Sequence, residues 1–243
     1  MSCAGGPDLV TNGLILHLDA GNSKSYNGGT VWRDLSGRNN HFNVVNGAHN
    51  SQFKYFDFKG SYGMAKNTSN ITLAGDVTYC CITRILNSTN SWRTLTRSYD
   101  ESSYGDHQVI VQAGAYNIGM YDNSSNGGFN GGVGFLGTNY SQQSLPGYST
   151  NSFDFMVWRF TNNDNPTYDF NVNGNQKGTI TNSNARYKAG FGSIGGWHEN
   201  SSVPSVGSQF WGDIQFFSVY NRRLTDLEVL QNYKALKGRL RLT

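Results

Sequence analysis

The stretch FWGDIQFFSVYNRRLTDLEVLQNYKALKG, residues 210–238, decides the fold class of this chain. Between positions 210 and 220 its apolar residues are too dense for a strand that has one solvent-facing side. Because side chains alternate along a strand, these residues divide into two faces. The faces consist of Phe210, Ile214, Phe216 and Tyr220 on one side and of Trp211, Phe217 and Val219 on the other. We therefore predict a strand covered on both faces, in the middle of a sheet with another element packed over it.

A helix is expected directly after this strand, because start and stop signals are both present. Thr225 and Glu228 form a Thr-x-x-Glu capping box, and Gly238 occupies the position of a left-handed helix exit. The apolar stripe of the helix is expected at a spacing of three, at Leu227, Leu230, Tyr233 and Leu236. The pattern predicts a helix over residues 226–237, the only substantial helix of the chain.

The composition favours a single all-β sandwich domain over residues 1–243. The chain has 14 Tyr, 14 Phe, 5 Trp and 30 Gly, residue types that suit half-buried strands and the turns between them. Only 14% of the residues are charged, and the net charge is +3. Such a weak and evenly spread charge argues against a nucleic-acid partner.

The three cysteines, Cys3, Cys80 and Cys81, form no disulfide framework. Their count is odd, and adjacent residues on a strand face opposite sides, so we expect reduced thiols with one of the adjacent pair in the core. The first residues lack the basic and apolar regions of a signal peptide, and no apolar run reaches membrane length. We therefore expect synthesis in a cytoplasm, no secretion through a signal peptide and no membrane partner.

Further strands are predicted where apolar and polar residues alternate between turn residues. They are 14–19, 53–58, 76–86, 93–97, 107–112, 116–121, 132–136, 152–161 and 191–194. The clearest hairpin turns at Asn173-Gly174-Asn175, and Trp32 is expected to anchor the turn-rich segment 20–40. With one terminal helix, this series excludes a parallel α/β sheet.

Four segments in order carry a resemblance to a known family. They are Gly13-Leu-Ile-Leu-His-Leu-Asp-Ala-Gly-Asn, Thr30-Val-Trp-Arg-Asp-Leu-Ser-Gly, Phe56-Asp-Phe-Lys-Gly, and Gly212-Asp-Ile-x-x-Phe-x-Val-Tyr-Asn-Arg-x-Leu-Thr. Together they resemble the concanavalin A-like lectin/glucanase superfamily in its laminin G-like form. The resemblance implies an all-β fold: a two-sheet antiparallel jelly-roll sandwich, here with one C-terminal α-helix.

The opening and the Tyr-Asn-Arg-x-Leu ending resemble, in particular, structural proteins of tailed bacteriophages. This resemblance implies a non-enzymatic virion protein on the capsid or tail surface, held to other virion proteins by protein–protein contacts. Residues 1–12 and 239–243 are candidate docking strands for a neighbouring subunit, since extended ends can add to the edge of a sheet. Pairing of these ends within their own domain is the equally weighted alternative.

Catalytic carboxylates are the first chemistry to test against this fold. Glycosidases of the fold need two closely spaced carboxylates on one strand, as in Glu-x-Asp-x-x-Glu. The chain contains no such arrangement: Glu101 and Glu199 lie in expected loops, and Glu228 belongs to the helix cap. We therefore expect no enzymatic activity.

Calcium is a candidate ligand, because laminin G-like sandwiches often bind it at their rim through Asp, Asn and carbonyl oxygens. Asp19, Asn22 and Asp34 are the candidate ligands. In the alternative interpretation, which we favour, Asp19 and Asn22 form Asx turns and Asp34 caps the turn at Ser36-Gly37.

Aromatic and amide side chains in the loops form a candidate surface for a sugar or for a protein. Aromatic rings stack on pyranose faces, and the same residue types anchor protein interfaces. The candidates are Trp197, His198, Asn200, Tyr99, Tyr104, Tyr121 and Tyr140. We favour the protein interface, with a lectin that recognises host-surface or environmental glycans as the alternative function.

Overall fold

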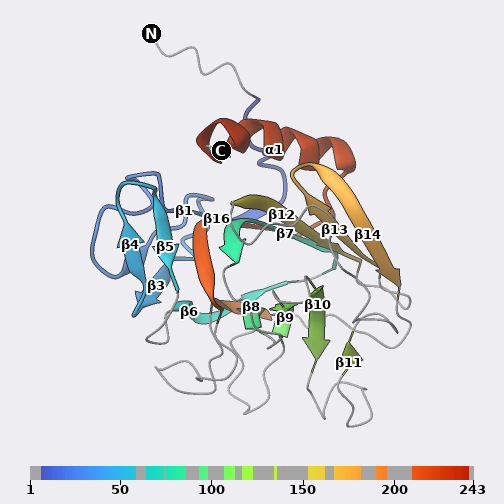
Figure 1. Cartoon of the computed structure of the whole chain (residues 1–243), viewed down its shortest axis with the longest axis horizontal. Coiled ribbons are helices and arrows are strands. Elements are labelled where there is room, and N and C mark those ends of the chain that lie inside the picture. The colour runs from blue at the N-terminus through green and yellow to red at the C-terminus, as the bar shows by residue number, and fades with distance from the viewer. Residues whose placement is uncertain are drawn as a thin grey trace.

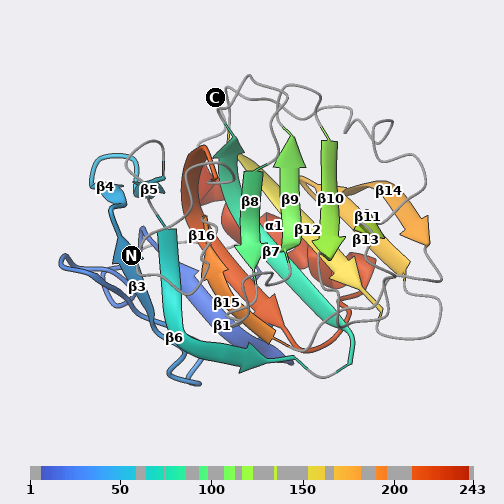
Figure 2. The same ribbon diagram turned by 90° about the horizontal axis from the view of Figure 1, so that it is seen from below.

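In the computed structural model of the chain, the described residues form two antiparallel sheets of eight strands each, which lie face to face (Figures 1 and 2). The structure describes residues 7–58, 64–73, 75–85, 93–97, 107–112, 117–122, 134–135, 153–161, 167–181, 190–195 and 210–240. Within these residues it contains one helix, α1 (Asp226–Leu240), at the C-terminal end. The predicted all-β sandwich with one C-terminal helix is confirmed.

We call the sheet next to α1 the helix-side sheet and the other the opposite sheet. The helix-side sheet has the order β14 (Asn175–Thr181), β13 (Thr167–Val172), β12 (Asp154–Phe160), β7 (Val77–Ile85), β16 (Gly212–Tyr220), β5 (Tyr55–Asp57) and β4 (Ala48–Asn50), and β1 (Leu14–Asp19) also pairs with β16. The opposite sheet has the order β11 (Gly134–Phe135), β10 (Asn117–Asp122), β9 (His107–Gln112), β8 (Arg93–Arg97), β15 (Gly190–Ile194), β6 (Met64–Thr72), β3 (Phe42–Val45) and β2 (Val31–Trp32).

Strand β16 is central and covered on both faces, as predicted, but its two faces are not those that strict alternation assigns. A register shift against β7 lies between Ile214 and Phe216. Such a bulge adds one residue and reverses the alternation beyond it. Ile214 therefore shares the core between the sheets with Phe217, whereas Phe216 and Tyr220 face the helix. The predicted grouping of Ile214 with Phe216 was wrong for this reason.

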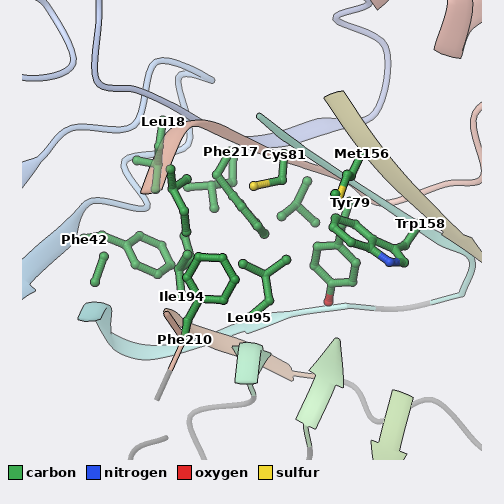
Figure 3. Close-up of a cluster of buried hydrophobic side chains, with 14 of the residues drawn as sticks. Leu18, Phe42, Tyr79, Cys81, Leu95, Met156, Trp158, Ile194, Phe210 and Phe217 are labelled. Carbon is green, nitrogen blue, oxygen red and sulfur yellow. The ribbon is translucent and has the colours of Figure 1, made fainter. Parts of the chain in front are cut away.

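The core between the sheets is built of large side chains from both layers (Figure 3). Trp32 is fully buried there, which confirms that it anchors the segment 20–40. Cys81 points into this core, and Cys80 lies on the opposite face of β7, in the cluster beneath the helix. The adjacent cysteines are thus both buried and free, on two sides of one strand.

Helix α1 lies across the outer face of the helix-side sheet (Figure 1). Its sheet-facing positions follow the spacing three, one and three, and they are Val229, Asn232, Tyr233 and Leu236. Leu227 was predicted to be in the apolar stripe, but it is 78% exposed. Two residues correspond to about 200° around a helix, so Leu227 points away from the side that Val229 buries. No helix in the described part of the chain is long and apolar enough to cross a membrane.

The end of α1 differs from the prediction. The helix continues through Gly238 to Leu240, and Gly238 does not have the positive φ of a left-handed exit. A glycine inside a helix costs only about 1 kcal/mol, so it does not by itself end one. The predicted docking strand 239–243 therefore starts with helical residues, and residues 241–243 lie outside the described part.

A buried charge network fixes the start of α1 to the helix-side sheet. The Arg159 guanidinium donates to the Leu224 carbonyl at 2.9 Å and pairs with Asp226 at 2.7 Å. It also pairs with Asp169 at 3.1 Å, and Arg223 pairs with the same carboxylate. Arg159 and Asp169 are both buried, so these contacts satisfy charges that would otherwise be costly.

The predicted hairpin is β13–β14. Asn173 and Gly174 have φ angles of 53° and 80°, as a two-residue hairpin turn of type I′ requires. The other predicted strands are present, with ends that differ by up to two residues. Four strands were not predicted, β2, β3, β4 and β6. The longest, β6, reads MAKNTSNIT, and its polar residues hide the alternation.

Candidate functional site

Most of the predicted aromatic and amide surface residues fall outside the described residues. These are Trp197, His198, Asn200, Tyr99, Tyr104 and Tyr140. Tyr121 lies in β10, and its backbone is opposite Phe135 of β11. The Phe210 N–H donates to the Gly195 carbonyl at 2.9 Å. The described residues on either side of segment 196–209, Gly195 and Phe210, are therefore hydrogen-bonded to each other beside the start of β16.

A second group of aromatic residues lies on the outer face of the helix-side sheet, and the sequence analysis did not predict it. It consists of Phe53, Tyr55, Phe153 and Trp211, together with the ion pair of Arg84 and Asp213; we call it the aromatic platform. Phe53 is 57% and Trp211 38% exposed. These are two of the three exposed large apolar side chains among the described residues, the third being Leu227.

Strand register brings the platform together from four distant parts of the chain. Asp213 of β16 lies opposite Asp57 of β5 on one side and opposite Arg84 of β7 on the other. Phe153 precedes β12, whose Asp154 is opposite the neighbouring β7 residue Thr83. Cross-strand neighbours on one face contact each other, which brings Tyr55, Phe153, Arg84 and Asp213 together. Phe53 and Trp211 each lie two residues before one of them, Tyr55 and Asp213 respectively.

The Arg84 guanidinium is the centre of the platform. Its Nε donates to Asp213 Oδ2 at 2.8 Å, and Asp213 is fully buried. The guanidinium carbon lies 5.0 Å from the centroid of the Phe153 ring and 5.6 Å from that of Tyr55, and the two rings are 5.5 Å apart. Arg84 is therefore held by a carboxylate and two aromatic faces, and its charge is balanced within the platform.

The turn before β5 holds Phe53 in its exposed position. The Asn50 side-chain oxygen accepts the Phe53 N–H at 2.9 Å, and the Asn50 amide donates to the Tyr55 hydroxyl at 3.2 Å. From β16, the Gln215 amide donates to the Phe53 carbonyl at 3.0 Å. Phe53 is thus presented by a fixed backbone. Exposed rings of this kind can anchor a protein partner or stack on a sugar ring.

Asp34 closes a turn of the segment 20–40. Its carboxylate accepts hydrogen bonds from the N–H groups of His17, Ser36 and Asn40 and from the Ser36 hydroxyl. Because these donors surround both carboxylate oxygens, the Asx-turn interpretation describes the geometry.

Asp19 and Asn22 form the two neighbouring Asx turns. Asp19 Oδ1 accepts the Gly21 N–H at 2.9 Å, and Asn22 Oδ1 accepts the Lys24 N–H at 3.0 Å. No group of three or more His, Cys, Asp or Glu side chains in the described residues could hold a metal ion. Calcium binding by Asp19, Asn22 and Asp34 stays a prediction.

Glu228 has the structural role that its sequence context predicts. Its carboxylate accepts the Thr225 N–H at 2.8 Å, and the Glu228 N–H donates to Thr225 Oγ1 at 3.3 Å, which completes the capping box. Arg222 donates to both carboxylate oxygens, at 2.6 and 2.9 Å. These bonds from Arg222 lower the pKa of Glu228 to about 2. Glu101 and Glu199 lie outside the described residues.

The two buried thiols are poor nucleophiles. Burial raises the pKa of Cys80 to about 12 and that of Cys81 well above its ordinary value. The thiolate is the reactive form of cysteine, and neither residue forms it near neutral pH.

Comparison with known proteins finds solved structures that share the fold of this chain. No family model matches the sequence, and no curated protein matches it. Solved structures with a similar fold include the Trypanosoma rangeli sialidase bound to the inhibitor DANA (TM-score 0.63, 15% identity, 96% of this chain and 34% of that chain). The binding domain of botulinum neurotoxin serotype D is also similar (TM-score 0.59, 16% identity, 95% and 52%).

These likenesses concern the fold alone, since the identities are far below those that accompany a shared activity. This chain spans about a third of the sialidase chain and about half of the toxin-domain chain. Both neighbours agree with an all-β sandwich fold.

Proposed function

We propose that this chain is a non-enzymatic structural or accessory protein of a tailed-phage particle. It is displayed on the capsid or tail surface and is attached to other virion proteins by protein–protein contacts. The phage assignment rests on the resemblance of its first and last segments to such proteins. The observation that carries the attachment is the aromatic platform, in which Phe53 and Trp211 are exposed.

The platform has the features of an interface centre. Its residue types, Trp, Tyr, Phe and Arg, are enriched at protein interfaces, and Trp, Tyr and Arg dominate binding energy. The Arg84 charge is already balanced by Asp213, so a partner that covers the platform leaves no unpaired cation behind. The backbone is fixed by sheet pairing and by Asn50, so little ordering accompanies binding.

The test measures incorporation into purified particles. Mass spectrometry should find the protein at a fixed copy number, and its absence from particles would overturn the proposal. In reconstitution with particles that lack it, Phe53→Ala and Trp211→Ala should each lower the affinity at least about tenfold, the loss typical of a hot-spot residue. Leu227→Ala is the matched control, because Leu227 is exposed but lies on the helix, away from the platform. Platform variants that bind like the control would contradict the platform as attachment surface.

A lectin is the second candidate, and the platform also supports it. The Phe53 N–H is bonded to Asn50, whose amide donates to the Tyr55 hydroxyl, and amide and hydroxyl groups can also bond to sugar hydroxyls. A glycan array with and without calcium tests this function. Binding that Trp211→Ala or Trp197→Ala abolishes would favour the lectin, and silence across the array would favour the attachment role.

A further inference from the structure

Residues 8–10, which we call the N-terminal strap, pack against α1. In Figure 1 the blue start of the chain passes alongside the helix. The Gln231 side-chain amide donates to the Asp8 carbonyl at 2.7 Å. Val10 is buried in the cluster beneath the helix, and Leu9 packs against the same cluster. The strap is thus held by a hydrogen bond and by apolar packing.

Two buried side chains recognise the backbone of Val10. The Val10 N–H donates to Asn232 Oδ1 at 2.8 Å, and the Tyr220 hydroxyl donates to the Val10 carbonyl at 2.9 Å. The Asn232 amide donates to the Tyr220 hydroxyl at 3.1 Å, so each side chain orients the other. Asn232 is 1% and Tyr220 0% exposed. We call Tyr220, Gln231 and Asn232 the strap slot.

The slot depends on its occupant. Without the strap, the Asn232 oxygen and the Tyr220 hydroxyl each lose a hydrogen-bond partner in a buried place, which is costly. The slot binds main-chain groups and one apolar side chain of the strap, and these groups are the same in every copy of the chain. An identical strap from a second copy would therefore make identical contacts.

The link between the strap and the sandwich is short. The Leu14 N–H, at the start of β1, donates to the Thr11 carbonyl at 3.1 Å, which closes a turn over residues 11–13. Gly13 has a φ of 79°, in the left-handed region that favours glycine, and a Cβ there would lie 3.0 Å from Asn221 Oδ1. A short, constrained hinge of this kind is the element whose opening permits exchange between copies.

We propose that the strap slot is an interaction surface for a second copy of this chain, which occupies it with its own residues 8–10. In dilute solution the short hinge keeps each strap in its own slot, since tethering gives it a high effective concentration. Where copies are crowded, or where the hinge cannot span the turn, straps exchange and link subunits. The inference does not depend on the function proposed above.

Shortening the hinge is the first test. Deleting Asn12 moves the strap by about 3.4 Å relative to its slot, further than a hydrogen bond tolerates. The variant that lacks only Asn12 should form dimers in a concentration-dependent manner, which light scattering would detect as a doubled mass. Asn12→Ala, with an unchanged hinge length, should remain monomeric at the same concentration. A deletion variant that stays monomeric at all concentrations would overturn the proposal.

Complementation between two variants is the second test. Val10→Asp removes the apolar side chain of the strap and leaves the slot unchanged, whereas Asn232→Ala removes a hydrogen-bond partner from the slot and leaves the strap unchanged. Each is combined with the hinge deletion, and near-ultraviolet circular dichroism checks that each chain is folded. Neither should form dimers alone. Their mixture should form a heterodimer, detected by native mass spectrometry from the different chain masses. A mixture that contains no heterodimer would refute strap exchange.

Discussion

Replacing Arg84 by methionine tests the central contact of the aromatic platform. Methionine keeps much of the length and apolar character of the side chain but removes the guanidinium. Asp213, which is fully buried, then loses the cation that it faces, and Tyr55 and Phe153 lose the group that lies 5.6 and 5.0 Å from their centroids. The expected result is a large loss of stability from a side chain that is itself 26% exposed.

The magnitude follows from the burial of the partner. Removing one member of a buried ion pair costs about 3–5 kcal/mol, because the other charge stays in a place that water does not reach. Arg84 is partly solvated, which favours the lower end, and each cation–π contact adds about 0.5–1 kcal/mol at a partly exposed site. We therefore expect Arg84→Met to lower the free energy of unfolding by about 4 kcal/mol.

Arg222 provides the matched control, since its side chain is also 26% exposed in its pair with Glu228. There, however, the carboxylate partner is 26% exposed instead of fully buried. Surface pairs are worth about 0–1 kcal/mol, so Arg222→Met should cost about 1 kcal/mol. The contrast between two arginines of equal exposure measures the combined effect of the partner's burial and of the two aromatic contacts of Arg84.

The assay is equilibrium urea unfolding, monitored both by tryptophan fluorescence and by circular dichroism. The two transitions must coincide if the protein unfolds in a two-state manner. A double-mutant cycle with Asp213→Leu should show a coupling energy of at least about 2 kcal/mol, because the double variant no longer buries a carboxylate that has lost its arginine. If Arg84→Met costs less than about 1 kcal/mol, or if the two changes are additive, the reasoning from burial is wrong.

Four further predictions concern the helix cap, the hairpin and the thiols. Thr225→Ala should cost about 1 kcal/mol in urea unfolding as the capping box is lost. The folded pKa of Glu228 is about 2, below the ordinary 4.5. Its contribution to stability should therefore be complete above pH 4.5, decrease as the pH falls from 4.5 towards 2 and be lost as the pH falls through 2. Urea midpoints measured between pH 6 and pH 2 would show this decrease. Gly174→Ala should cost about 1–2 kcal/mol, because φ is 80° and the new Cβ would lie 3.1 Å from Tyr233; thermal unfolding would measure it. With Cys80 and Cys81 buried, at most one of the three cysteines should react with a thiol reagent in the native protein and all three in urea; two fast thiols in the native protein would contradict this.

Local signals were sufficient for the helix and for most strands. The Thr225–Glu228 capping box and the Asn173-Gly174 turn act through neighbours within a few residues, so the sequence displays them directly. The same is true of the two faces of β7 at Cys80 and Cys81, since alternation needs no tertiary information. The stripe of α1 was mispredicted at Leu227, because a spacing of three does not follow one helix face for long.

The candidate site was harder to predict than the fold. Trp211 was recognised as an apolar strand residue, but nothing in its neighbourhood indicates that it is exposed. Arg84 and Asp213 are 129 positions apart and meet only because β7 and β16 pair in one register. The bulge between Ile214 and Phe216, which sets the faces of β16, leaves no mark in the sequence. The loop aromatics around Trp197 and Tyr140 stay a prediction.

The element types, the turn chemistry and the helix cap can be predicted from the amino-acid order alone, because propensity, periodicity and hydrogen bonds to near neighbours act within a few residues. The folded structure is needed to see which side chains meet across strands, as Arg84 and Asp213 do, and that Val10, near the start of the chain, lies against Asn232 of the helix. Those contacts join residues 129 and 222 positions apart, and they depend on strand order and register, which the whole core selects together.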